Sequence, residues 1–127
     1  MKVKAFDPPR VFKVGVSKEI EIKDTAHIRL DADEQITLIT EVGGEYDIVR
    51  KDWGYYATPS LNGRLSGFGL RGALVKGADG KFFLLLVEAG KEPQFHTYLA
   101  AQKMDVIVWL DDEGDLSRLE KAAKGKS

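Results

Sequence analysis

The stretch that decides the fold runs from Phe82 to Leu110 and reads FFLLLVEAGKEPQFHTYLAAQKMDVIVWL. Its opening run, Phe82 to Val87, is continuously apolar and predicts a strand that is covered on both faces. Met104 to Leu110 predicts a second buried strand. Between them, a proline suited to a first helical turn precedes residues at helical spacing, namely Pro93, Phe95, Tyr98, Leu99 and Gln102. The stretch therefore predicts a strand–helix–strand unit.

Toward the N-terminus, apolar and polar side chains alternate with a period of two. The alternating runs are separated by short polar breaks and cover residues 11–16, 20–23, 28–30 and 36–40. This pattern is typical of half-buried antiparallel strands joined by hairpin turns. Pro8 and Pro9 disfavour helix, so residues 1–10 are expected to form an extended lead-in. The N-terminal third therefore predicts a meander of about four strands.

Further strands are expected over residues 45–50 and 70–75, and a closing helix from Asp115 to Lys124, with Asp115 as its cap and lysines at its end. The predicted fold class is α+β, mainly antiparallel β as a rolled sheet or sandwich, with a C-terminal strand–helix–strand unit and a closing helix. The alternative is an all-β jelly roll, which would require Phe95 to Leu99 to be a strand. With no internal repeat or long linker, we expect a single domain over residues 1–127.

Composition narrows the function classes. Twenty acidic and nineteen basic residues leave no basic excess, which disfavours nucleic acid as a partner. The chain has no cysteine, so disulfides, thiolate metal sites and cysteine nucleophiles are excluded. The N-terminus lacks the apolar core of a signal peptide, and the longest apolar run is too short to cross a bilayer. We therefore expect a cytoplasmic protein with no membrane association.

Cofactor and metal signals are weak. Gly67 to Gly72 reads GFGLRG and matches a dinucleotide fingerprint, but another turn follows too soon for the helix that this motif needs. The two histidines stand apart from each other, so no metal and no cofactor is predicted. His27 is out of phase with its apolar neighbours, which indicates a solvent-facing strand residue. The alternative is that His27 is a general base, with Tyr55 or Tyr56 as the acid.

The segment from Arg50 to Arg71 combines aromatic side chains with directional donors in sequence rich in glycine. The candidate ligand-binding residues are Trp53, Tyr55, Tyr56, Asn62, Arg64 and Arg71. Aromatic faces stack on sugar rings or bases, and asparagine and arginine supply hydrogen bonds with defined direction. The alternative is that the aromatic rings fill a small core while the polar groups cap turns.

The same segment also carries a resemblance. Residues 52–65, DWGYYATPSLNGRL, followed by FLLLVE at 83–88 and VIVWL at 106–110, resemble small bacterial proteins of unassigned activity. Those proteins are associated with gene clusters for cell-surface sugars, including sialic-acid-like ones. The resemblance covers residues 20–112 and implies a role in carbohydrate biosynthesis, but it implies no catalytic residue.

Three functions follow as hypotheses. The first is an accessory domain that binds a sugar, a nucleotide-sugar or a partner enzyme through residues 53–71. The second is a metal-independent sugar epimerase or isomerase that uses His27 with a tyrosine. The third is a structural interaction module, such as a homodimer formed through an exposed sheet face.

Overall fold

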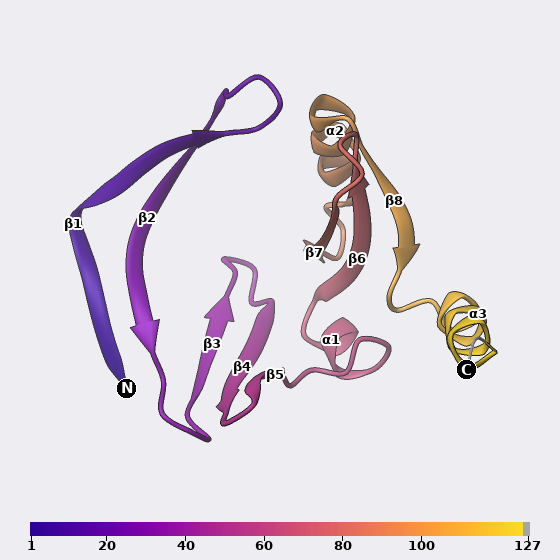
Figure 1. Ribbon diagram of the computed structural model, residues 1–127, viewed down its shortest axis with the longest axis horizontal. Coiled ribbons are helices and arrows are strands. Elements are labelled where there is room, and N and C mark those ends of the chain that lie inside the picture. The colour runs from indigo at the N-terminus through magenta and orange to yellow at the C-terminus, as the bar shows by residue number, and fades with distance from the viewer. Residues whose placement is uncertain (126–127) are drawn as a thin grey trace. The chain divides into compact units, whose positions relative to one another are not determined.

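The computed structural model describes residues 1–125 (Figure 1). The chain divides into two compact units. Unit 1 comprises Met1–Ile36 and Asp47–Ala57, and unit 2 comprises Thr37–Tyr46 and the residues from Thr58 onward. The expectation of a single domain stays a prediction. Across residues 1–125, no helix is both long enough and apolar enough to span a membrane.

Unit 1 is built on a long antiparallel ribbon of β1 (Lys2–Val14) and β2 (Ile20–Arg29) (Figure 1). Residues 1–10 are extended as expected, but from Lys2 onward they belong to β1 and are not a separate lead-in. The two prolines are tolerated because the pairing register shifts between Ala5 and Arg10, where no ladder hydrogen bond is needed from them.

The predicted break inside β2 is wrong, because that strand runs without interruption through Asp24 and Thr25. The carboxylate of Asp24 bonds to Arg10 on the partner strand and to His27 on its own strand. These side-chain contacts hold Asp24 and Thr25 within the strand, although the polar composition of this dipeptide predicted a turn.

The middle of the chain forms a small antiparallel arrangement of β3 (Gln35–Ile39), β4 (Glu45–Lys51) and β5 (Gly54–Ala57), in the order β3-β4-β5. β4 and β5 are joined by the two-residue turn Asp52-Trp53, with Lys51 opposite Gly54. Gly54 has a φ of +150°, which a residue with a side chain rarely adopts. This glycine therefore helps to fix the hairpin.

Unit 2 holds an antiparallel sheet in the order β7-β6-β8, formed by β6 (Leu70–Gly77), β7 (Phe82–Glu88) and β8 (Met104–Trp109). Helix α2 (Glu92–Gln102) connects β7 to β8 across the central strand β6 (Figure 1). Ala73, Val75 and Leu99 form the core, and the partly buried side chains around them are Leu85, Phe95, Met104, Val106 and Trp109. The strand–helix–strand prediction is confirmed, and the jelly-roll alternative is wrong because residues 95–99 are helical.

One expectation about β7 is wrong. Phe82, Phe83 and Leu84 are 56%, 40% and 54% exposed, although the continuous apolar run predicted cover on both faces. β7 is an edge strand, and the core beneath α2 includes Leu85 but not the three residues before it. An apolar run alone does not distinguish an edge strand from a central one.

Two further helices complete unit 2. Helix α1 (Arg64–Gly67) is a single turn whose Leu65 is fully buried. Helix α3 (Glu113–Lys124) begins two residues before the predicted start, and its cap is Asp112, not Asp115. The helix has no buried residue, and Leu119 is 51% exposed. The α+β class with mainly antiparallel sheet is nevertheless as predicted.

Candidate functional site

The aromatic side chains of the candidate segment lie at the end of the β4–β5 hairpin in unit 1. Trp53 occupies the turn and is 68% exposed, while Tyr55 and Tyr56 on β5 are 60% and 52% exposed. The alternative that these rings fill a small core is therefore wrong. Successive strand residues point to opposite faces, so the two tyrosines face opposite ways. We call residues 50–56 the aromatic hairpin.

Arg50 makes this hairpin rigid. Its guanidinium donates to the carbonyl oxygens of Lys51 and Gly54, the latter at 2.9 Å, and lies 5.4 Å from the centre of the Tyr55 ring. Arg50 and Tyr55 are also direct cross-strand partners. The guanidinium therefore satisfies turn carbonyls and supports one tyrosine by a cation–π contact. The exposed rings are thus carried on a turn whose carbonyl groups Arg50 satisfies.

The remaining predicted ligand-binding residues belong to unit 2 and contact other parts of that unit. The amide nitrogen of Asn62 donates to Glu113 at 3.0 Å, which connects the segment before α1 to the start of α3. The guanidinium of Arg64 lies 5.3 Å from the centre of the Phe68 ring. Both residues are exposed, and within unit 2 both have a structural role that accounts for their position.

Arg71 is the most constrained of the predicted residues. Its Nε and Nη2 atoms donate to Asp111 at 2.7 and 3.0 Å, and its Nη1 lies 3.3 Å from Glu92. The guanidinium also stacks on Trp109 at 4.0 Å from the ring centre. Hydrogen bonding to Arg71 holds the pKa of Asp111 below its ordinary value, and the same bond raises the pKa of Arg71. This arrangement joins β6, α2 and β8, and it leaves few donors of Arg71 free for a ligand.

The six predicted residues are therefore divided between the units. Trp53, Tyr55 and Tyr56 share one exposed hairpin in unit 1, whereas Asn62, Arg64 and Arg71 are held in unit 2. In the GFGLRG motif, Gly69 has a structural role. Gly69 has a φ of +82°, and strand β6 follows it where a dinucleotide site would need a helix.

His27 projects from β2 and is exposed. Its Nε2 lies 3.0 Å from Asp24 Oδ2 and 3.2 Å from a guanidinium nitrogen of Arg10, and its ring meets Phe6 edge-on. Hydrogen bonds from Arg10, and then from His27, hold the pKa of Asp24 below its ordinary value. The Nε2 atom of His27 is therefore engaged by side chains of the ribbon itself.

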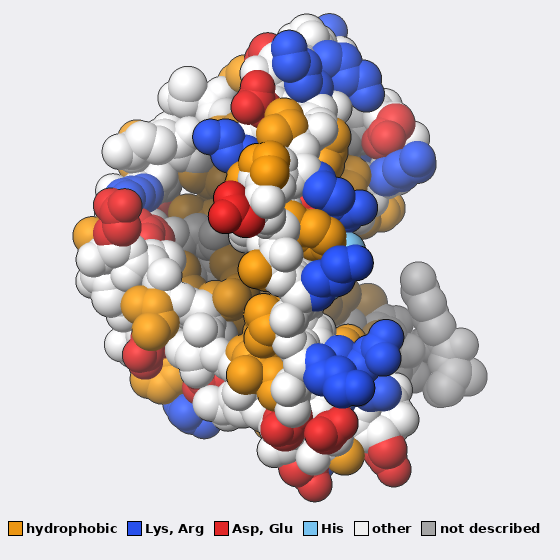
Figure 2. Space-filling model, turned by 90° about the vertical axis from the view of Figure 1, so that its left-hand side faces the viewer, with side chains coloured by type: hydrophobic (Ala, Val, Ile, Leu, Met, Phe, Trp, Pro, Cys, Tyr) orange, Lys and Arg blue, Asp and Glu red, His pale blue; other side chains and the backbone are white. Residues whose placement is uncertain are grey.

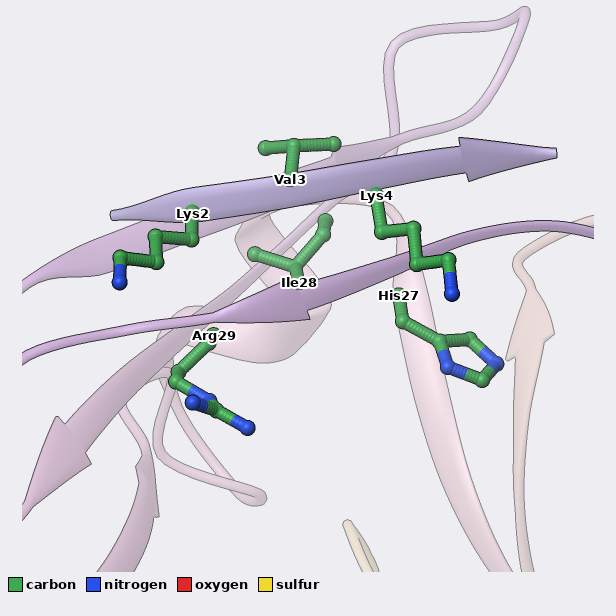
Figure 3. A pocket seen from close by; sticks show the side chains of 6 residues that line it. All are labelled: Lys2, Val3, Lys4, His27, Ile28 and Arg29. Carbon is green, nitrogen blue, oxygen red and sulfur yellow. The ribbon is translucent and has the colours of Figure 1, made fainter.

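A shallow hollow of about 350 Å³ lies beside His27 on the ribbon (Figure 3). Its lining residues are Lys2, Val3, Lys4, His27, Ile28 and Arg29. No tyrosine is among them, so the hollow lacks the acid that the epimerase hypothesis pairs with His27. Within residues 1–125, no group of three or more histidine, aspartate or glutamate residues could hold a metal ion. The chemistry that these surfaces offer is stacking and charge recognition.

Sequence reasoning missed Lys2, Lys4 and Arg29 as candidate site residues. A signal was present, because Lys2-Val3-Lys4 and His27-Ile28-Arg29 each alternate cationic or polar with apolar side chains. Only the register of β1 against β2 shows that the two triplets face each other. Comparisons with protein-family models, with curated proteins and with solved structures found no match for this chain.

Proposed function

We propose that this protein is a non-catalytic binding domain that holds a sugar or nucleotide-sugar for a partner enzyme of bacterial surface-carbohydrate biosynthesis. The aromatic hairpin is the contact surface in this proposal. The observation that carries it is the exposure of Trp53, Tyr55 and Tyr56 on one short hairpin.

Three large aromatic side chains on one hairpin provide exposed ring faces that a partner can cover. Aromatic faces match the apolar C–H faces of a pyranose ring, and a tryptophan platform also accepts a nucleobase. The guanidinium of Arg50 beneath Tyr55 adds positive charge next to the platform, which favours an anionic sugar or a nucleotide. A non-catalytic role fits the engaged His27 and the absence of a tyrosine from the hollow beside it.

The two tryptophans of the chain give an internal control for the test. Trp53 lies on the aromatic hairpin, and Trp109 stacks on Arg71 in unit 2. In a titration followed by NMR with N-acetylglucosamine, UDP-N-acetylglucosamine and CMP-N-acetylneuraminate, we expect the indole N–H signal of Trp53 to shift while that of Trp109 stays in place. Equal shifts of both signals, or none for Trp53 at millimolar ligand, would contradict the proposal.

Substitutions at Trp53, with one control variant, test the same proposal through binding affinity. Trp53→Ala should weaken binding by about tenfold or more, because one stacked ring contributes about 1–3 kcal/mol. Trp53→Phe should restore part of the affinity. Phe82→Ala is the matched control, since Phe82 is 56% exposed but lies on β7 in unit 2.

A further inference from the structure

The end of the β1–β2 ribbon that is formed by residues 2–4 and 27–29 places cationic side chains directly opposite one another. Lys2 pairs with Arg29 and Lys4 pairs with His27, while Val3 pairs with Ile28 between them. Figure 3 shows Lys2, Lys4, His27 and Arg29 pointing to one side of the ribbon, and Val3 to the other. We call this side the cationic face, and its charged residues are Lys2, Lys4 and Arg29.

This pairing is unfavourable for the ribbon by itself, because like charges directly opposite in an antiparallel pair destabilise it. The other end of the same ribbon shows the usual arrangement, with Arg10 opposite Asp24 and Lys13 opposite Glu21. The contrast within one pair of strands indicates that strand pairing does not account for the cationic face.

The neighbouring carboxylates do not neutralise this face. Asp24 is bonded to Arg10 and His27, and Asp33 is bonded to Lys51. Glu34 accepts the backbone N–H of Asp31 at 2.7 Å and also lies 3.0 Å from the amino group of Met1. In the described part of the chain, Lys2 and Arg29 make no ion pair, and the ammonium of Lys4 contacts only the Phe6 ring, at 5.6 Å. The positive charge is therefore available to a ligand.

We propose that the cationic face is a phosphate-binding site, and that its ligand is a diphosphate group. A guanidinium offers paired donors that match phosphate oxygens, and ammonium groups add charge without strict geometry. Lys2, Lys4 and Arg29 carry three positive charges over two cross-strand pairs, about 7 Å along the strand, which suits a compact anion. The chain as a whole carries a net charge of −1, so it lacks the overall basic excess that a long nucleic acid favours.

The position of this face connects it to the aromatic hairpin. Both belong to unit 1, and the turn after β2 contacts each of them. On one side, Glu34 meets the amino group next to Lys2, and on the other, Asp33 meets Lys51 at the base of the hairpin. A nucleotide-sugar could then place its diphosphate on the cationic face and a ring on Trp53. This extension to a nucleotide-sugar rests on the proposed function, whereas the phosphate site does not. Figure 2 shows the side of the molecule that carries the ribbon, where Lys and Arg side chains lie beside a row of apolar ones.

The test uses inorganic pyrophosphate, which has no ring for the hairpin. In NMR titrations of the full chain, we expect amide shifts at residues 2–4 and 27–29 that weaken as sodium chloride is added. Arg29→Gln should weaken binding by about tenfold, while Lys13→Gln should change it less than about twofold, because Lys13 lies on the same ribbon opposite Glu21. Arg29→Gln removes a like-charge pair, so the variant should remain folded by circular dichroism.

The outcomes separate the two proposals. Pyrophosphate shifts at the cationic face without any response of Trp53 to N-acetylglucosamine, UDP-N-acetylglucosamine or CMP-N-acetylneuraminate would support the phosphate site and contradict the sugar-binding function. A response of Trp53 to a sugar ligand without pyrophosphate shifts at the cationic face would overturn the phosphate site but not the sugar-binding function. Equal losses for Arg29→Gln and Lys13→Gln would show only diffuse charge attraction and would overturn it as well. Tighter binding of single-stranded oligothymidylate than of pyrophosphate, with shifts along the whole ribbon, would show that the ligand class is wrong.

Discussion

Replacing Arg71 should destabilise unit 2 because one side chain connects three of its elements. The guanidinium on β6 makes two hydrogen bonds to Asp111 after β8, contacts Glu92 at the start of α2 and stacks on Trp109. Asp111 is only 16% exposed and Arg71 is 29% exposed, so water replaces the lost bonds incompletely. Arg71→Ala therefore leaves the mostly buried carboxylate of Asp111 without its partner.

We expect Arg71→Ala to lower the free energy of unfolding by about 2–3 kcal/mol. Breaking a fully buried pair costs about 3–5 kcal/mol, and partial exposure reduces that range. Arg71→Lys keeps the charge but loses the paired geometry and the stacking, so its cost should be about 1–2 kcal/mol. Urea unfolding followed by tryptophan fluorescence measures both values, and Trp109 reports on the site directly.

The same pair sets a pH dependence whose sign follows from Asp111. Arg71 holds the pKa of Asp111 below its ordinary value, so the pair stabilises the folded state above the unfolded pKa of about 4. That contribution is lost as the pH falls through the lowered folded-state pKa. The stability gap between wild type and Arg71→Ala should therefore narrow in acid. A gap below about 0.5 kcal/mol at neutral pH, similar to that of the exposed-pair control Arg118→Ala, would refute the reasoning.

Four other changes can be tested in the same way. Leu65→Ala should cost about 2–5 kcal/mol in urea unfolding, because this side chain is fully buried in α1. Lys103→Gly should raise the melting temperature by relieving a left-handed residue at φ 57° that ends α2, a gain of about 1 kcal/mol. Asp112→Ala should cost about 1 kcal/mol and reduce helical circular dichroism, since its carboxylate caps α3 at 2.8 Å from the Asp115 amide. Amide hydrogens of β1 should exchange faster than those of β6, because Leu30 is the one buried side chain among the described residues of unit 1.

Local sequence patterns predicted an element of the fold well where a single pattern determined its structure. The proline at position 93 followed by helical spacing identified α2, and alternating side chains identified β3 and the later part of β1 as strands. The errors arose where tertiary contacts determined the local structure or the burial of a residue. Composition could not show that Asp24 is held within β2 by Arg10, or that Phe82 lies on an edge strand. Pairing partners and strand order are non-local, and no periodicity within one segment encodes them.

The candidate site was predictable to a similar degree. Residue types alone suggested Trp53 and Tyr55 for stacking, but whether such rings fill a core depends on what the rest of the chain covers. For Arg71, sequence reasoning could not detect Asp111, forty positions away, which engages its guanidinium. The cationic face could not be assembled at all, since Lys2 and Arg29 are distant in sequence and meet only through the ribbon register.

Stability and exposed functional groups are unevenly distributed between the two units. Unit 2 contains the packed core around Ala73, Val75 and Leu99, while unit 1 presents the exposed rings and the opposed cations on strands with little buried surface. A two-stranded ribbon is marginally stable in water, and like charges across it reduce that margin further. A ligand that binds only the ordered ribbon stabilises it by RT ln(1 + [L]/Kd), about 2.7 kcal/mol at a hundredfold excess over Kd. A bound diphosphate would also remove the repulsion between Lys2 and Arg29. The features that weaken unit 1 in isolation are therefore the ones through which an anionic ligand would order it most.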